Sequence, residues 1–206
     1  MDDLRRRRLK IATLNDLNDP FELLAINLSN SELRHAFAQM KKQLAETRGL
    51  LCFSRRWNTP VHWSHYAAKH AGLCLGFDVP DEHLAPVEYS GKRLAVEVER
   101  LMHPRNIDEA TAFKFLSTKF SHRRYEAEMR CFLTLEDRDV ETGLYFADFS
   151  DRLKLAQVIV GAVSTISQRD LSHALGELAP NIEAFKARLA FNTFNVVRQR
   201  NAEQWL

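Results

Sequence analysis

The sequence predicts a single α+β domain in which helices flank a central, mostly antiparallel sheet. Short apolar runs alternate with two or three amphipathic helical segments, and neither a linker nor a repeat divides the 206 residues. A chain of this length can bury a full core without disulfides or a metal. The runs with the length and composition of buried strands are residues 50–53, 72–77, 129–135 and 158–161.

Ahead of the first of these runs, the chain is expected to form one strand and one long helix. The pattern at residues 5–14 predicts the strand, and the Asn-Asp-Pro sequence at 18–20 predicts a tight bend after it. The helix extends to about Thr47, with Ser29 or Ser31 as its N-cap. Its apolar stripe consists of Leu33, Phe37, Met40 and Leu44.

A helix at residues 62–71 is expected to join the runs at 50–53 and 72–77 into a strand-helix-strand unit. Pro60 suits the first turn of this helix, and Gly72 suits its end. Helical spacing then gives two faces. One carries Trp63, Tyr66 and His70, and the other carries His62, His65 and Lys69.

After the run at 72–77 we expect a polar turn, a short strand within 85–91 and a second helix at 108–119. Asp108 is the expected cap of that helix. Its apolar positions are Phe113, Leu116 and Phe120.

The last third is expected to contain strands at 128–135 and 156–163, the latter buried on both faces. A helix at 167–178 follows, with Ser167 as its N-cap and Asp170 completing a capping box. The tail is expected to form a half-buried strand and a hairpin through Asn192. The apolar positions that alternate in this strand are Phe185, Ala187, Leu189 and Phe191.

Composition excludes several classes of protein. A net charge of +2 gives no strong signal for nucleic acid, and no apolar run approaches the roughly 18 residues of a membrane span. The charged start has no signal-peptide pattern, so we expect a cytoplasmic protein without a membrane partner. Each cysteine lies in an apolar run, which predicts buried, reduced thiols and no zinc site. These are Cys52, Cys74 and Cys131.

Glu126 and Glu128 form the first chemical constellation. Two carboxylates two residues apart at the start of a strand are expected to project to one side and repel each other. Such a pair can raise one pKa and supply a general base, or stabilise a cationic transition state. The alternative is an ordinary ion-pair network on a solvated edge, with Arg130 as the main partner. The other arginines available for that network are Arg123 and Arg124.

Polar groups near residues 54–66 form the second constellation. Ser54, Arg55 and Arg56 could hold an anion such as a pyrophosphate, because guanidinium groups bind phosphates bidentately; surface solvation is the alternative. His62 and His65 could ligate a metal if a third ligand came from elsewhere, but no HExxH or paired-cysteine spacing supports a site, and we expect no metal. For Trp63 and Tyr66 the alternative to a binding role is core packing.

Several motifs in order resemble the bacterial domain-of-unknown-function family 2971, which carries no assigned activity. Members of that family usually begin with a tyrosine-containing strand and helix ahead of the NDPFE turn. This chain starts inside that helix, so we expect it to lack the N-terminal strand. The matching motifs are NDPFE at 18–22, FS at 53–54, WSHYA at 63–67, GFD at 76–78, Tyr89, YEAEMR at 125–130 and VIVG at 158–161.

The order of these motifs is also similar to that of NAD-dependent ADP-ribosyltransferases. The similarity implies an ADP-ribosyltransferase-like fold and cleavage of the nicotinamide glycosidic bond of NAD. Glu128 would stabilise the oxocarbenium-like state with help from Glu126, while Tyr66 would stack on nicotinamide. The first-strand residue that binds the adenosine half has no clear equivalent unless Arg8 or Lys10 replaces it. The implied cofactor-binding residues are Ser54, Arg55, Trp63 and His65.

Two classes of function therefore stay open at this point. One is an enzyme that uses NAD as its substrate, with an acceptor that the sequence does not identify. The other is a non-catalytic nucleotide- or protein-binding regulatory module that uses the same residues. The position of Glu128, in a cleft or on an exposed strand edge, separates the two classes.

Overall fold

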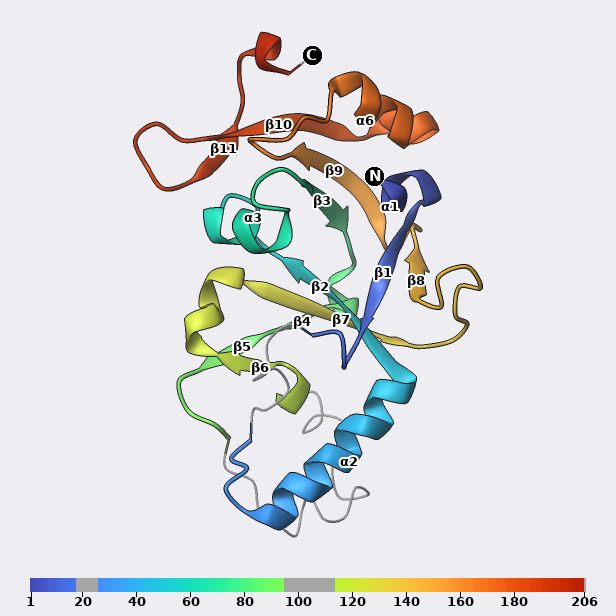
Figure 1. Cartoon of the computed structure of the whole chain (residues 1–206), viewed down its shortest axis with the longest axis vertical. Helices are drawn as coiled ribbons and strands as arrows, with labels where there is room; N and C mark the ends of the chain where they lie inside the picture. Colours follow the sequence, from blue (N-terminus) through green and yellow to red (C-terminus); the bar gives the residue numbers. More distant parts are fainter. Residues whose placement is uncertain (18–25, 95–113, 206) are drawn as a thin grey trace. The chain divides into compact units, whose positions relative to one another are not determined.

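A computed structural model of the chain describes residues 1–17, 26–94 and 114–205 and has a mixed α+β fold with several sheets (Figure 1). The described residues divide into two compact units, each assembled from separate stretches of the chain. Unit 1 comprises Met1–Leu9, Arg56–Pro80 and Ala147–Leu206, and unit 2 comprises Lys10–Arg55 and Asp81–Phe146. The expected single domain stays a prediction.

Unit 1 contains a four-stranded sheet in the order β11-β10-β9-β3. The β3 and β9 strands are antiparallel, β9 and β10 are parallel, and β10 and β11 form the antiparallel hairpin expected at the end of the chain. The helices of this unit are α1 (Asp2–Arg6), α3 (Pro60–Tyr66) and α6 (Gln168–Leu175). The strands are β3 (Leu73–Asp78), β9 (Lys154–Val160), β10 (Glu183–Leu189) and β11 (Val196–Arg198).

The core of unit 1 lies on both faces of β9. Val158 and Val160 pack in one apolar cluster with Leu171 of α6. Ile159, which points to the other face, packs with Trp63 of α3. The prediction that this strand is buried on both sides is confirmed. Ser167 and Asp170 form the expected capping box at the start of α6.

Unit 2 contains most of a five-stranded sheet in the order β4-β7-β2-β1-β8, and the boundary between the units falls within β1 and β8. A separate pair, β5 and β6, is parallel. The long helix α2 (Ser31–Thr47) carries the expected apolar stripe. The strands are β1 (Arg8–Thr13), β2 (Arg48–Ser54), β4 (Ala85–Pro86), β5 (Glu88–Ser90), β6 (Thr118–Phe120), β7 (Glu128–Thr134) and β8 (Tyr145–Asp148).

All four apolar runs form strands, but they do not share one sheet. The runs at 50–53 and 129–135 supply β2 and β7, whereas those at 72–77 and 158–161 supply β3 and β9 of the other sheet. The prediction of one central sheet is therefore wrong. Apolar runs indicate which segments are buried as strands, but they do not specify which strands pair.

The helix boundaries differ from the prediction in two places within unit 2. The N-cap of α2 is Asn30 rather than either serine, because its extended backbone lets the side chain accept from the Glu32 and Leu33 amides. The expected helix at 108–119 ends earlier. Residues 114–116 are helical, but 118–120 form β6, which pairs with β5. Residues 18–20, Asp108 and Phe113 lie outside the described residues.

The helix that begins at Pro60 is shorter than expected, because it ends at Tyr66 instead of continuing to residue 71. The next segment turns through left-handed backbone, with φ of 46°, 54° and 71° at Ala68, Lys69 and His70. The His70 amide donates to the Trp63 carbonyl at 3.0 Å, which closes the turn. A Cβ at Gly161 would overlap the His70 carbonyl oxygen, so glycine is required where the turn meets the end of β9.

Short 3₁₀ helices connect several of these elements: η1 (Asp81–His83), η3 (Ser121–Glu126), η4 (Gly176–Asn181) and η5 (Ala202–Gln204). Among the residues that the structure describes, no helix is both long and apolar enough to cross a membrane.

The three cysteines are thiols rather than halves of disulfides, but the prediction that all are buried is wrong. Cys52 is exposed, whereas Cys74 and Cys131 are partly buried. The apolar cluster that covers Leu50 with residues of α2 does not extend along β2 to Cys52. Burial raises the pKa of the Cys74 thiol from 9.0 to about 11, and it also raises the pKa of Cys131.

These environments predict that a thiol reagent at pH 8 labels Cys52 first. The thiolate is the reactive form, and a pKa near 11 lowers its population at Cys74 by about 100-fold relative to a pKa of 9.0. Mass spectrometry of peptides from briefly labelled native protein measures the order, and Cys52→Ser serves as the control that loses the fast phase. Labelling of Cys74 ahead of Cys52 would contradict the structure.

Candidate functional site

The Lys119 ammonium group lies between the two carboxylates of the E-x-E motif. Its Nζ donates to Glu126 Oε2 at 2.7 Å and to Glu128 Oε2 at 2.6 Å, and all three side chains are at most 7% exposed. Glu126 ends η3, Ala127 adopts left-handed backbone with φ of 43°, and Glu128 begins β7. The carboxylates therefore converge through a turn, rather than through the alternation of an extended strand.

Two arginines complete this buried cluster. Arg130, which is 0% exposed, donates from Nε to Glu128 Oε1 at 2.8 Å and from Nη1 to the Leu116 carbonyl. Arg123 lies 3.4 Å from Glu126 Oε1. The Tyr89 hydroxyl accepts from the Glu128 amide at 2.8 Å. Arg130 pairs with Glu128 as expected, but Lys119 pairs with both carboxylates, and the network is buried rather than on a solvated edge.

The charges of the cluster determine the ionisation of Glu128. Burial, the largest single effect, raises the pKa of its carboxyl group, but the charges and hydrogen bonds of Arg130 and Lys119 outweigh burial and leave the pKa below its ordinary value of 4.5. The idea that repulsion between the carboxylates raises a pKa therefore fails for Glu128. This residue is a fixed anion at neutral pH, not a proton donor.

Ser54 and Arg55 lie beside the carboxylates, as the anion-site hypothesis requires. Ser54 is directly opposite Glu128 in the β2-β7 pairing, and its Oγ donates to the Glu126 carbonyl at 2.7 Å. The Arg55 amide donates to the Ala127 carbonyl at 3.1 Å. Unit 2 thus brings together four predicted site residues: Ser54, Arg55, Glu126 and Glu128.

The remaining candidates on α3 belong to unit 1. Trp63 is buried in the core and its Nε1 donates to the Trp57 carbonyl at 2.6 Å. Core packing, the alternative to a binding role, therefore describes Trp63, whereas Tyr66 is 52% exposed and is not a core residue. The ring centroids of His62 and His65 lie 5.7 and 6.4 Å from that of Tyr66, in T-shaped geometry. That Tyr66 and Glu128 share one cleft stays a prediction.

The other cations considered for an anion site lie in different parts of the structure. Lys10 forms an exposed ion pair with Asp16 at 3.5 Å, and Arg8 begins β1. Arg56 belongs to unit 1, whereas Arg55 belongs to unit 2. In the described ranges, no group of three or more His, Cys, Asp or Glu side chains could hold a metal ion.

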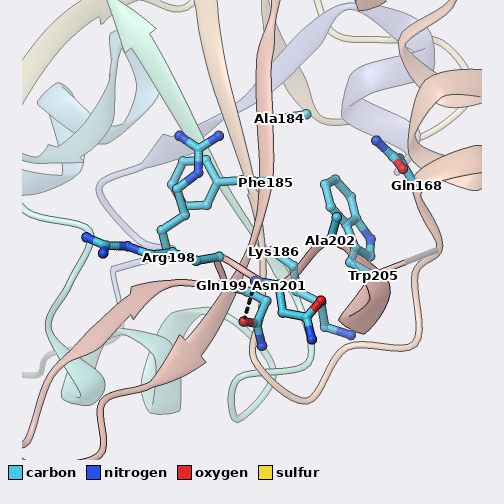
Figure 2. Close-up of a pocket in the computed structure, with 10 residues that line it drawn as sticks. Gln168, Ala184, Phe185, Lys186, Arg198, Gln199, Asn201, Ala202 and Trp205 are labelled. Carbon is cyan, nitrogen blue, oxygen red and sulfur yellow. Dashed lines mark hydrogen bonds between the residues drawn. The ribbon is translucent and has the colours of Figure 1, made fainter.

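Two features of the structure were missed by the sequence analysis. Lys119 was assigned to the end of a helix, and only its position in β6 turns its ammonium group toward the carboxylates. In unit 1, a pocket of about 370 Å³ lies where β10, β11 and the end of the chain meet (Figure 2). Its cations, Lys186, Arg198 and Arg200, are far from any motif, although the alternation in β10 signalled a strand with one polar face.

Comparisons of the chain with protein-family models, with curated proteins and with solved structures find no match. The resemblances to family 2971 and to ADP-ribosyltransferases therefore stay predictions.

The cluster predicts that Lys119→Met lowers the free energy of unfolding by about 3–5 kcal/mol, because the change leaves two buried carboxylates with one cation fewer. Urea unfolding followed by circular dichroism measures the loss. Lys114→Met is the matched control, since Lys114 is exposed, and it should change stability by no more than about 0.5 kcal/mol. Equal stability of the two variants would show that Lys119 does not hold the cluster together.

Proposed function

We propose that the chain is a non-catalytic module that binds a nucleotide. The position of Lys119 between Glu126 and Glu128 is the observation that supports a non-catalytic role. Both carboxylates that could act in catalysis already have buried cationic partners. They are hence arranged as parts of a structural network, which is a common origin of perturbed carboxylates.

The charges around the two carboxylates also support a non-catalytic role. Cleavage of the glycosidic bond of NAD develops positive charge, which a catalytic site stabilises with net negative potential. Among the described residues, the two carboxylates contact Lys119 and Arg130, which are buried, and Arg123, which is partly exposed. Carboxylates already paired with buried cations are poorly placed to stabilise an oxocarbenium-like state.

Cleavage of NAD on an ADP-ribosyltransferase-like fold is the second candidate, and one observation favours it. Ser54 lies opposite an ionised Glu128, and the resemblance to the transferases assigns a role in NAD binding or cleavage to each of them. In this mechanism Glu128 acts as a fixed anion beside the ribose, and the Lys119 ammonium must leave Glu128 when NAD binds. A proton-transfer role for Glu128 does not fit its lowered pKa.

Chromatography of free nicotinamide, together with calorimetric titration of NAD and ADP, separates the two candidates. We expect binding of nucleotide without release of nicotinamide, because the carboxylates stay paired. The enzyme candidate instead predicts release that falls by roughly 100-fold, or about 3 kcal/mol, in Glu128→Gln. Glu88→Gln, an exposed carboxylate of β5, is the matched control.

Release of nicotinamide by the unaltered chain would overturn the non-catalytic proposal. If that release persisted in Glu128→Gln, the chain would be an enzyme whose site lies elsewhere. Absence of binding to either nucleotide at millimolar concentration would overturn the ligand class.

A further inference from the structure

The hairpin of β10 and β11 displays apolar side chains to solvent at its tip. Along β10 the apolar positions alternate, but only Phe185 and Ala187 are buried. Leu189 is 54% exposed, and the loop residues Phe191 and Phe194 are 92% and 98% exposed. In Figure 1 the loop between β10 and β11 projects beyond the ends of the strands. Large apolar side chains gathered on one projecting loop indicate an interaction surface.

Hydrogen bonds across its base hold the loop in one shape. The Ala190 amide donates to the Asn195 carbonyl at 2.9 Å, and the Asn195 carboxamide donates to Thr193 Oγ1 at 3.3 Å. Phe191 and Phe194 are therefore displayed by a closed turn. A surface that binds them orders little additional chain, which favours binding.

The same hairpin carries an excess of positive charge. Glu183 pairs with Arg198 at 2.6 Å, and residues 183–202 contain no other carboxylate against four basic side chains. The strand register pairs Ala187 with Arg198, and Arg188 is in the next pair, so the two arginines lie on opposite faces of the hairpin. The four basic residues are Lys186, Arg188, Arg198 and Arg200.

Cations on opposite faces suit a flat anionic surface that meets the tip of the hairpin end-on. The Arg188 guanidinium lies 4.3 Å from the centre of the Phe191 ring, so a surface that buries this ring also reaches the guanidinium. A nucleic-acid strand would instead need the rings and the cations along one groove, where bases stack and phosphates follow. A second copy of the hairpin would bring charges of the same sign together, which opposes association.

We propose that the tip of this hairpin binds the surface of an anionic lipid bilayer. Phe191 and Phe194 enter the boundary between headgroups and acyl chains, and Arg188 binds the lipid phosphates. Apolar side chains beside cations are the chemistry that such a surface binds. This binding goes beyond the proposed function and does not depend on it.

The proposal differs from the expectation of no membrane partner, which rested on the whole chain. A net charge of +2 and the lack of a long apolar run bear on long-range attraction and on membrane spans. They do not bear on a hairpin that inserts only the side chains of its loop.

Sedimentation of the full chain with phospholipid vesicles tests the proposal. The chain should bind vesicles of equal parts phosphatidylserine and phosphatidylcholine, and bind at least about tenfold less to phosphatidylcholine alone or at high salt. Phe191→Ser and Phe194→Ser should each weaken binding by about tenfold or more, because each loses an aromatic ring from the lipid. Val163→Ser, which removes an apolar side chain that is 62% exposed elsewhere in unit 1, is the matched control and should bind like the unaltered chain.

Arg188→Gln supplies a second variant with a different signature. It should weaken binding to the anionic vesicles by about fivefold and leave the weak binding to phosphatidylcholine unchanged, because only the electrostatic attraction is lost. Arg152→Gln, an exposed arginine of unit 1 outside the hairpin, should bind both kinds of vesicle like the unaltered chain. Urea unfolding should be the same for the phenylalanine variants and the unaltered chain, since both rings lie outside the core.

Absence of binding to anionic vesicles by the unaltered chain would overturn the proposal. Binding that persisted at full strength in both phenylalanine variants would also overturn it, because another surface would then hold the lipid. A dimer, or a complex with a single-stranded oligonucleotide, that forms in place of vesicle binding and is lost in Phe194→Ser would assign the tip to that partner instead.

Discussion

One ammonium group shared by two buried carboxylates is the constraint on which unit 2 depends. Lys119 belongs to β6, Glu126 to η3 and Glu128 to β7, so the cluster connects the β5-β6 pair to the five-stranded sheet. Tyr89 of β5 joins the same cluster through the Glu128 amide. Removal of one partner from such a network is costly, because the charge that remains is buried without compensation.

The same constraint decides how the E-x-E motif is interpreted. Spacing alone allows a catalytic pair, since two nearby carboxylates can differ in pKa. The contacts of Glu128 with Arg130 and Lys119 instead hold its pKa low and leave it ionised. A motif that suggests transfer chemistry in the sequence is thereby compatible with a structural role.

Local sequence patterns predicted much of the secondary structure. The features that these patterns did not predict depend on contacts between residues far apart in the chain. The capping box at Ser167 and the alternation around Phe185 depend on neighbouring residues, so the sequence showed them. The distribution of the strands over two sheets and the position of Lys119 depend on partners far along the chain. The early end of α3 at Tyr66 depends on a turn packed against Gly161, which no helix-stop signal near His70 encodes. Of the candidate site, Ser54 and the carboxylates were predicted together, while the cations that neutralise them were only partly identified.

The pH dependence of unfolding tests the central claim most directly. A carboxyl whose pKa is lowered on folding stabilises the folded state above its unfolded pKa, here close to 4.5, and loses that contribution as the pH falls through the folded pKa. Urea unfolding between pH 7 and pH 3 should therefore show stability falling below about pH 4.5, and falling less in Glu128→Gln than in the unaltered chain. Other carboxyls with lowered pKa, those of Asp16, Asp170 and Glu183, contribute equally to both proteins, so the difference isolates Glu128. Identical pH profiles for the two proteins would contradict the account of a buried, ionised Glu128 held by Lys119 and Arg130.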